Sequence, residues 1–531
     1  MHPPFLLWHL PRYHAERRPD ARALTSGGEH LTYARLAREI ERCAAALQAL
    51  GIRRGDRVAV WLDKRPETVI ACFGAAAAGA IFVPINPLLK AEQVHYLLRD
   101  SGARCLVSAP TRLRTLLPWP EGVAPGVLAV DEPGQGVPPE AHSWRECLAQ
   151  AGAFAAPPAT ENDVAAILYT SGSTGRPKGV VLSHRNLVAG AQSVASYLEN
   201  SPEDVLLAAL PLSFDAGFSQ LTTAFCAGAR VVLLNYLLPV DVLRTMERER
   251  VTGLTAVPPL WVALAELDWP APVAAHLRYF ANTGGKLPRR VLERLRALAP
   301  QAKPYLMYGL TEAFRATYLP PEEIDRRPDS IGRAIPNAEV FVLREDGTPC
   351  APREVGEIVQ SGPLVAQGYW NDPERTAERF RPLPPAVDPR PSPVPAREWA
   401  VYSGDYGWLD EEGYLYFAGR RDEMIKTSGY RVSPTEIEEA LIASGLVREC
   451  CACGLEDERL GQIIAVALQP AVEPFDLEAL RRHCRQHLPP YQMPQVFLLS
   501  DQPLPRNPNG KLDRPAIRER LARYAKTQTQ V

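Results

Sequence analysis

Long apolar runs and an excess of charge of either sign are missing from this sequence. No stretch of roughly 18 uninterrupted apolar residues occurs, so no membrane-spanning helix is predicted. The formal net charge of −2 over 531 residues gives no electrostatic reason to expect nucleic acid or an anionic membrane as a partner. The N-terminal stretch is apolar but short, with neither a basic start nor a small-residue cleavage site, so no signal peptide is expected.

Cysteine is scarce and scattered. The chain has ten, and only Cys450, Cys451 and Cys453 lie close together. No histidine or second cysteine pair accompanies them at a zinc-binding spacing, so they are predicted to be small buried hydrophobic residues of a strand. Reduced cysteines without a signal peptide predict a cytoplasmic protein.

The composition, 46% hydrophobic, is that of an ordinary globular protein, and the length is too great for a single core. Strand and helix patterns alternate along the first part of the chain, as in the strand predicted over 57–62, the helix from Pro66 and the strand over 81–84. Apolar spacing predicts a further helix over 31–50. This alternation predicts an α/β fold with a largely parallel, doubly wound sheet.

The pattern changes near residue 420. Beyond Asp422, helices are predicted over 434–442 and 477–486 and strands over 448–455, 463–469 and 496–499. About 110 residues of this α+β pattern suffice for a small domain. We therefore expect a large domain over residues 1–421 and a small one over 422–531. Between 382 and 395, seven of fourteen residues are proline, which predicts an exposed loop, either a plain surface insertion or a polyproline docking segment.

A loop rich in glycine and hydroxyl side chains joins two apolar strands, 164–168 and 180–182. Glycines let main-chain N–H groups approach an anion, and hydroxyls and a lysine add donors and charge. Gly179, like the other glycines, permits backbone angles that other residues resist. The Walker motif is excluded, because no Gly-Lys-Ser/Thr leads into a helix. The loop predicts a polyphosphate site formed by Thr170, Ser171, Gly172, Ser173, Thr174, Gly175 and Lys178.

At this loop the sequence resembles the adenylate-forming superfamily: acyl-CoA synthetases, adenylation domains of peptide synthetases, and luciferases. The resemblance extends from about Leu31 to Arg514. It implies a large N-terminal AMP-binding domain of βαβ layers and a small α+β C-terminal lid. It also implies a reaction in which MgATP adenylates a small-molecule carboxylic acid and the acyl group then passes to a thiol. The implied cofactors are ATP, Mg²⁺ and either CoA or the phosphopantetheine of a carrier protein.

Two further motifs of the large domain carry the resemblance, Asn282–Pro288 and Tyr308-Gly-Leu-Thr-Glu312. By resemblance, Thr311 contacts the α-phosphate region and Glu312 helps to hold Mg²⁺. A metal and hydroxyl donors suit the reaction, because a carboxylate that attacks a phosphate brings two anions together. The adenine and ribose region is implied to include Gly284, Gly285, Tyr308 and Gly309.

The remaining motifs lie towards the C-terminus. By resemblance, Asp405 accepts hydrogen bonds from the ribose hydroxyls, Arg420 is a second ribose contact, and Asp422 is the hinge. In Lys426–Arg431, Gly429 is implied to line the thiol tunnel and Arg431 to reach the phosphate. In Pro505–Asp513, Lys511 is the implied catalytic lysine, which stabilises charge in the transition state.

The acid and the acceptor remain open. Phe214-Asp215 resembles the substrate pocket of amino-acid adenylation domains, where the aspartate pairs with the substrate ammonium; the less favoured alternative is that Asp215 is a helix N-cap. Leu310, where peptide-synthetase domains usually have proline, favours an acyl-CoA ligase. The alternative is an enzyme that loads a separate carrier protein, because no carrier domain follows Lys511. A non-catalytic homologue and a luciferase-like oxygenase are weaker alternatives, since the residues of every motif are present.

Overall fold

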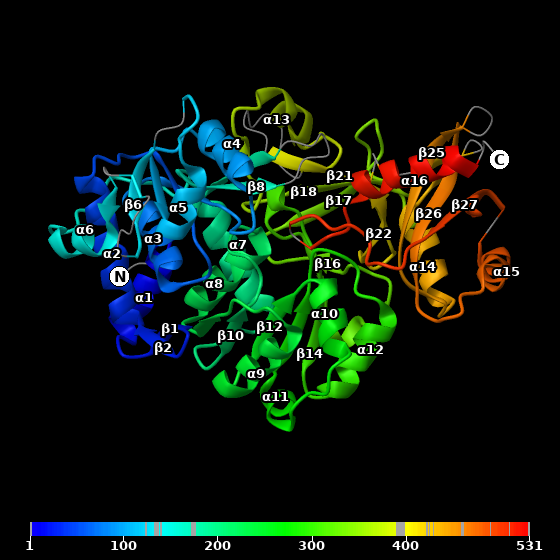
Figure 1. Cartoon of the computed structure of the whole chain (residues 1–531), viewed down its shortest axis with the longest axis horizontal. Coiled ribbons are helices and arrows are strands. Elements are labelled where there is room, and N and C mark those ends of the chain that lie inside the picture. The colour runs from blue at the N-terminus through cyan, green and yellow to red at the C-terminus, as the bar shows by residue number, and fades with distance from the viewer. Residues whose placement is uncertain are drawn as a thin grey trace. The chain divides into compact units, whose positions relative to one another are not determined.

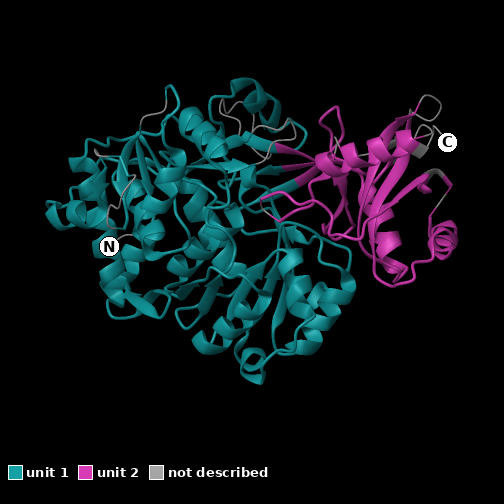
Figure 2. Cartoon of the chain, viewed as in Figure 1, with its two compact units in different colours: residues 1–340, 360–401 teal, residues 341–359, 402–531 magenta. Residues whose placement is uncertain are grey.

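The computed structural model describes residues 3–122, 125–131, 137–138, 141–170, 177–388, 399–420, 423, 425–427, 430–457, 461–488, 490–508 and 510–528. The chain forms two compact units, Met1–Val340 with Gln360–Val401, and Phe341–Val359 with Tyr402–Val531 (Figure 2). The division falls within strands β17 (Glu339–Leu343), β18 (Gly356–Ser361) and β21 (Trp399–Leu409). A domain boundary between residues 421 and 422 stays a prediction.

Most strands of the first unit form two sheets (Figure 1). Across the first sheet lie β16 (Arg333–Ala334), β15 (Thr317–Leu319), β14 (Lys303–Tyr308), β13 (Tyr279–Asn282), β12 (Gly253–Ala256), β10 (Val205–Ala208), β11 (Arg230–Leu233), β1 (Arg22–Ser26) and β2 (Glu29–Thr32). Across the second lie β19 (Gly368–Tyr369), β9 (Lys178–Ser183), β8 (Val164–Thr170), β4 (Ile81–Pro84), β3 (Arg57–Trp61), β5 (Cys105–Ser108), β6 (Gly126–Ala129) and β7 (His142–Ser143).

Parallel pairs make up the centre of both sheets, and antiparallel pairs lie towards the edges. This arrangement confirms the predicted α/β fold, but the strands divide between two sheets where one was expected. The helices of this unit are α1 (His9–Arg17), α2 (Tyr33–Ala49), α3 (Pro66–Ala77), α4 (Ala91–Ser101), α5 (Pro110–Leu116), α6 (Trp144–Gln150), α7 (His184–Tyr197), α8 (Asp215–Ala227), α9 (Pro239–Glu249), α10 (Pro258–Ala265), α11 (Ala271–His276), α12 (Arg289–Leu298) and α13 (Pro373–Arg379), with short 3₁₀ turns η1 (Thr311–Ala313) and η2 (Pro321–Glu323).

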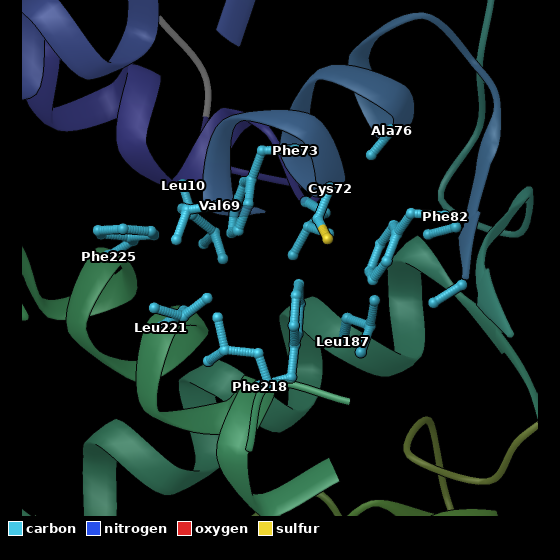
Figure 3. Close-up of a cluster of buried hydrophobic side chains, with 14 of the residues drawn as sticks. Leu10, Val69, Cys72, Phe73, Ala76, Phe82, Leu187, Phe218, Leu221 and Phe225 are labelled. Atoms are coloured by element: carbon cyan, nitrogen blue, oxygen red, sulfur yellow. The ribbon is translucent and has the colours of Figure 1, made fainter. Parts of the chain in front are cut away.

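The main core of this unit joins the two sheets through their helices. Phe218 of α8 stacks on Phe82 of β4, with ring centroids 4.9 Å apart, and on Phe73 of α3 at 5.8 Å. Figure 3 shows these rings meeting between α3 and α8, with Leu221 and Phe225 alongside. Since α8 packs on the first sheet and α3 on the second, burial of these rings stabilises one sheet against the other.

The helix predicted over 31–50 begins later than expected. Leu31 lies in β2, where it pairs with Leu24 of β1, and α2 starts at Tyr33. The Thr32 hydroxyl caps α2 by accepting from the Arg35 N–H at 3.2 Å, and an N-cap residue has extended rather than helical backbone angles. The other predicted elements of this region, among them the strand Ile81–Pro84, are confirmed.

The second unit has a sheet of its own. Its strands are β24 (Tyr430–Val432), β23 (Ile425–Thr427), β26 (Gly461–Pro470) and β25 (Val447–Asp457), with β27 (Val496–Leu499) beside β26. Helices α14 (Pro434–Ala443), α15 (Leu477–His487) and α16 (Arg514–Gln528) and the turn η3 (Pro490–Gln492) complete the α+β arrangement predicted for this region. A separate five-stranded sheet has the order β17-β18-β21-β20, with β20 (Phe380–Pro382) in the first unit and β22 (Leu415–Arg420) paired with β21.

Cys450, Cys451 and Cys453 are buried in β25, which confirms them as small core residues. Within the described ranges, no helix combines the length and apolar character needed to cross a bilayer. Of the proline-rich segment, residues 389–398 lie outside the described residues. In the part before them, Pro382 ends strand β20, Pro385 and Ala386 are exposed as predicted, and Leu383 is fully buried.

Candidate active site

Three predicted site segments meet at one edge of the first sheet. Strands β10, β12, β13 and β14 are parallel neighbours, so their carboxyl ends lie along the same edge, where open α/β sheets bind ligands. The segments that end or follow these strands are Phe214–Asp215 after β10, Gly284–Gly285 after β13 and Tyr308–Glu312 at the end of β14. Topology therefore brings together motifs that lie far apart in the sequence.

The predicted phosphate loop connects β8 to β9. Thr170, the last residue of β8, pairs with Lys178, the first residue of β9. Ser171, Gly172, Ser173, Thr174 and Gly175 lie outside the described residues. The Thr170 hydroxyl oxygen is buried and has no hydrogen-bond partner among the described residues. A buried hydroxyl without a partner is costly, so Thr170 is suited to bind a ligand atom.

Gly179 does not adopt one of the unusual backbone angles that glycine permits. Gly179 lies within β9, opposite Tyr169 of β8, and its backbone is not left-handed. A Cβ atom at this position would lie 2.6 Å from the Ile167 Cγ2 atom. Glycine is therefore needed for close strand packing rather than for turn geometry.

A buried network joins the phosphate loop to the second motif. The Lys178 ammonium donates to Glu312 Oε1 at 2.8 Å and to the Tyr369 hydroxyl oxygen at 2.9 Å, and the Tyr369 hydroxyl donates to Glu312 Oε1 at 2.7 Å. Burial alone would raise the pKa of Glu312, but the Lys178 charge and both hydrogen bonds lower it below its ordinary value. Glu312 is thus an anion. Burial and the neighbouring Glu312 raise the pKa of Tyr369, which stays a hydroxyl donor.

Tyr369 is a site residue that sequence reasoning missed. It lies in β19, whose pairing with β9 brings it to Lys178. Its separation from Lys178 is 191 residues, and no local spacing signals that pairing.

The residues present fit MgATP. No group of three His, Cys, Asp or Glu side chains able to hold a metal occurs within the described part of the chain, so a magnesium ion here would have Glu312 as its candidate carboxylate ligand. Mg²⁺ beside phosphates is commonly held in this way, by one or two carboxylates together with phosphate oxygens and water. Glu312 would hold the ion, and the partnerless Thr170 hydroxyl and the Lys178 ammonium would meet phosphate oxygens. Thr311 is buried in η1 next to Glu312.

The loop after β13 is held by Asn282. The Asn282 side-chain amide donates to the Gly285 carbonyl oxygen at 2.7 Å, while Gly284 has a φ of +77°, a left-handed angle that favours glycine. This turn keeps Gly284 and Gly285 accessible at the edge of the sheet, as an adenine contact requires.

Asp215 has a charged partner that the sequence did not suggest. Asp215 Oδ2 lies 3.4 Å from Nη1 of Arg315, and both side chains are buried. Asp215 is the first residue of α8 rather than its N-cap, which is Phe214, so the capping interpretation is wrong. The helix N-terminus still favours its negative charge. Nη1 of Arg315 also donates to the Phe314 carbonyl oxygen at 2.8 Å.

The start of α8 is fixed by a close backbone approach. A Cβ atom at Gly217 would lie 1.8 Å from the Pro211 carbonyl oxygen. Only glycine allows this contact, and the contact sets where Phe214 and Asp215 stand relative to the end of β10.

The second unit holds the predicted ribose contacts. Asp405 of β21 and Arg420 of β22 are cross-strand partners, and their side chains form an ion pair with Nε 3.2 Å from Oδ1. Asp405 is buried, whereas about half of the Arg420 side chain is exposed, at 53%. Asp422 and Gly429 lie outside the described residues. Arg431 belongs to β24, and its side chain lies outside the described part of the structure.

Lys511 lies on a tight hairpin of the second unit. The Asn507 N–H donates to the Lys511 carbonyl oxygen at 2.8 Å, and the Lys511 N–H donates to Asn507 Oδ1 at 3.1 Å. Arg506 bridges the hairpin, because its guanidinium donates to the Gly510 carbonyl oxygen at 2.9 Å and also pairs with Glu449 of β25. The turn predicted from the Asn-Pro-Asn-Gly sequence is therefore braced against the sheet.

Comparison with known proteins identifies the family of this fold and site. The family of AMP-binding enzymes matches residues 12–370, and the C-terminal domain of AMP-binding enzymes matches residues 436–511. These ranges contain the phosphate loop and the Glu312 motif in the first match and Lys511 in the second.

Similar proteins agree with this assignment over nearly the whole chain. A feruloyl-CoA synthase from Amycolatopsis is 32% identical over 97% of this chain and 98% of its own length. An L-proline–[L-prolyl-carrier protein] ligase from Streptomyces coelicolor is 33% identical over 93% of this chain and 92% of its own length. The structure of o-succinylbenzoate-CoA synthetase from Bacillus subtilis, in complex with ATP and magnesium, has a TM-score of 0.81 at 28% identity and covers 96% of this chain and 99% of that one. The chain belongs to the family of AMP-binding enzymes and is an AMP-forming ligase of the acid–thiol class.

Proposed function

We propose that this enzyme activates a carboxylic acid with MgATP and transfers the acyl group to the thiol of CoA. The observation that carries the proposal is the network of Lys178, Glu312 and Tyr369 beside the phosphate loop. It holds a buried carboxylate anion and a buried ammonium at the point where an ATP-dependent ligase must handle a magnesium ion and a leaving pyrophosphate.

In the first step a carboxylate oxygen attacks the α-phosphorus of ATP. The new bond joins the acid to AMP, and the bond between the α-phosphorus and the departing pyrophosphate breaks. Mg²⁺ supplies neutralisation of phosphate charge when it is bound. Lys178 and Thr170 hold the leaving pyrophosphate, and Lys511 stabilises the charge that develops on the oxygens around the α-phosphorus.

In the second step the thiol sulfur attacks the acyl carbon, the thiol proton is lost, and the bond from the acyl carbon to AMP breaks. No side chain is needed as a covalent nucleophile, because the mixed anhydride is already reactive. In this proposal Asp405 and Arg420 hold the ribose, and residues 422–531 turn about Asp422 between the steps. Lys511 then serves the first step, and Gly429 and Arg431 serve the second.

The Asp215–Arg315 pair favours an acyl-CoA ligase over an amino-acid ligase. An amino-acid substrate would place its ammonium on Asp215, a carboxylate that already has a buried arginine as its counter-ion. A second cation there would be repelled by Arg315 and would leave a net positive charge in a buried site. The carrier-protein ligase remains the second candidate, because the prolyl-carrier protein ligase is as similar to this chain as the feruloyl-CoA synthase.

A pyrophosphate-release screen tests the proposal. The enzyme, with MgATP, is offered fatty, aromatic and amino acids, each with and without CoA. We expect release with a subset of the non-amino acids, and a thioester product only with CoA. Activation of amino acids alone, without a CoA thioester, would favour the carrier-protein ligase. Release with none of the acids, from folded protein, would favour a non-catalytic homologue.

A further inference from the structure

An internal cavity of about 20 Å³ lies in the first unit, between α7, α8 and the first sheet. A space of this size holds about one water molecule. Much of its wall is apolar, but several polar side chains also line it, among them the guanidinium that pairs with Asp215. The polar lining residues are Ser219, Gln220, Thr223, Thr255 and Arg315.

Two of these polar residues have an unsatisfied atom. Arg315 is 2% exposed, and its Nε–H has no hydrogen-bond partner among the described residues. Gln220 is 6% exposed; its amide nitrogen donates to the Thr255 carbonyl oxygen at 3.0 Å, but its Oε1 atom has no partner within the described part of the chain. One lining residue is thus a donor without an acceptor, and another is an acceptor without a donor. Groups buried in this way are costly unless something binds them.

The cavity adjoins the candidate active site. Arg315 follows Glu312 by three residues, and it contacts Asp215 at the start of α8. Ala216, the next residue of α8, lines the cavity. The cavity therefore lies next to the segment that carries Asp215 in the predicted substrate pocket.

The charge of this region decides which end group fits. Arg315 is already balanced by Asp215, so a second carboxylate would leave a net buried negative charge, and an ammonium a net positive one. A methyl group is neutral but would leave both the Nε–H and the Oε1 atom without partners. A hydroxyl group is neutral and can both accept and donate a hydrogen bond, so of these groups it is the one that offers a partner to an N–H donor as well as to an amide oxygen.

We infer that the acid activated by this enzyme carries a hydroxyl group at its far end, which binds in this cavity between Arg315 and Gln220. The inference rests on the proposed function and names the class of its substrate, the hydroxy acids. The small cavity admits the hydroxyl and little else, so long alkyl chains are excluded from it. Water occupying the cavity without any role in selection is the competing explanation.

The test is ATP–pyrophosphate exchange with matched series of acids. An aliphatic series varies the end group of C4 to C6 acids among hydroxyl, methyl, carboxylate and amino, and an aromatic series does the same at the para position of benzoate. We expect the best hydroxy acid to exceed its methyl counterpart in kcat/KM by about tenfold to a hundredfold, because the methyl acid leaves a buried polar group without its partner.

Two variants locate that selectivity. Arg315→Lys keeps the positive charge beside Asp215 but removes the Nε–H, and Gln220→Met removes the Oε1 acceptor at similar volume. Each is expected to reduce the preference for hydroxyl over methyl to within about threefold. The control is Thr222→Val, in the same helix. Thr222 is fully buried, and its hydroxyl donates to the Ser219 carbonyl oxygen, but it is not among the residues that line the cavity. The preference of Thr222→Val for hydroxyl over methyl acids should therefore match that of the wild type. Thermal unfolding midpoints check that every variant is folded.

Outcomes of the screen separate the inference from the proposed function. Equal use of hydroxyl and methyl acids, preference for dicarboxylates or amino acids, or an unchanged preference in both variants would overturn the inference and leave a cavity with water only. Exchange with fatty acids or other aromatic acids, but with no hydroxy acid, would overturn the inference and leave the proposed function valid. Absence of exchange with every acid offered would overturn the proposed function as well.

Discussion

The Lys178 ammonium lies 2.8 Å from the Glu312 carboxylate, and both side chains are largely buried. Removal of one member of such a pair leaves the other as an uncompensated buried charge, which is strongly destabilising. The pair is therefore balanced only while both charges have partners. A metal ion can take the place of Lys178 beside Glu312, and a phosphate oxygen can take the place of Glu312 beside Lys178. The site can therefore accommodate MgATP without a net buried charge.

Glu312→Gln is the first variant to test this role. Loss of the carboxylate removes the predicted magnesium ligand, so ATP–pyrophosphate exchange should fall by about 10²-fold to 10³-fold and need more Mg²⁺ for half-saturation. Glu249→Gln is the matched control. Glu249 is a buried carboxylate of the same unit, 2.9 Å from Arg230, and its loss should lower stability but not exchange. Exchange in Glu312→Gln within about twofold of the wild type would contradict the assignment.

Lys511→Ala should abolish exchange while the protein stays folded. The lysine serves only the adenylation step in our proposal, so the variant should still convert supplied acyl-adenylate and CoA to the thioester. We expect a loss of at least about 10²-fold in exchange and less than about threefold in the second step. Lys526→Ala, in α16, is the control. Equal losses in both steps would assign Lys511 a structural role, and wild-type exchange would exclude a catalytic one.

Asp405→Asn tests the ribose contact. A hydrogen bond to a charged group contributes about 1.5–3 kcal/mol, so the KM for ATP should rise about tenfold or more, whereas the KM for 2′,3′-dideoxy-ATP, which lacks both ribose hydroxyls, should change little. Asp410→Asn serves as the control, because Asp410 accepts from the Glu412 and Tyr414 N–H groups in the neighbouring turn. If both nucleotides lose affinity equally, Asp405 acts on the fold or on another part of the nucleotide.

Local features of the site could be predicted from the sequence, because they depend on local residues. The strand–loop–strand unit at Thr170 and Lys178 follows from two apolar runs around a glycine-rich loop, and the pairing of these two residues is observed. The turn at Asn507 and Lys511 follows in the same way from Asn-Pro-Asn-Gly. Such local signals predict which strands and turns form, but not which other elements they pair with.

Long-range partners could not be predicted. Tyr369 reaches Glu312 across 57 residues, and Arg315 reaches Asp215 across 100. These contacts depend on strand order and register, which alternation of strands and helices does not specify. The same limit explains why one sheet was expected: β4 and β10 have similar apolar patterns, yet they lie in different sheets. Asp215 was consequently interpreted without its arginine.

Gly217→Ala should disturb both stability and substrate binding. A methyl group there would lie 1.8 Å from the Pro211 carbonyl oxygen, so α8 must shift, at a cost of about 1–3 kcal/mol or more. The shift also moves Phe214 and Asp215, so the KM for the acid should rise. Gly152→Ala is the control, since Gly152 has open space around it and no left-handed backbone. An unchanged unfolding midpoint in Gly217→Ala would show that the helix start adapts without strain.

The last prediction concerns acid stability and rests on His184. The Leu7 N–H donates to His184 Nδ1 at 3.1 Å, so this nitrogen must stay unprotonated. Burial lowers the pKa of His184 from 6.5 to about 4, and its place as the first residue of α7 also disfavours a positive charge. Between these pH values the unfolded chain binds the proton and the folded chain does not, so the contribution of His184 to stability is complete above pH 6.5 and declines as the pH falls towards 4.

His184→Asn isolates this contribution. Asparagine keeps an acceptor oxygen for the Leu7 N–H but does not titrate. Each unit by which the pKa differs between the folded and unfolded chain corresponds to ~1.4 kcal/mol. Between neutral pH and pH 4, the free energy of unfolding of the wild type should therefore fall by up to ~3 kcal/mol more than that of the variant. Denaturant unfolding at each pH measures this difference. His142→Asn, at an exposed histidine of β7, should follow the wild-type curve. Parallel curves for the wild type and His184→Asn would mean that the buried imidazole is protonated in the folded state, and that the Leu7 N–H has exchanged its partner.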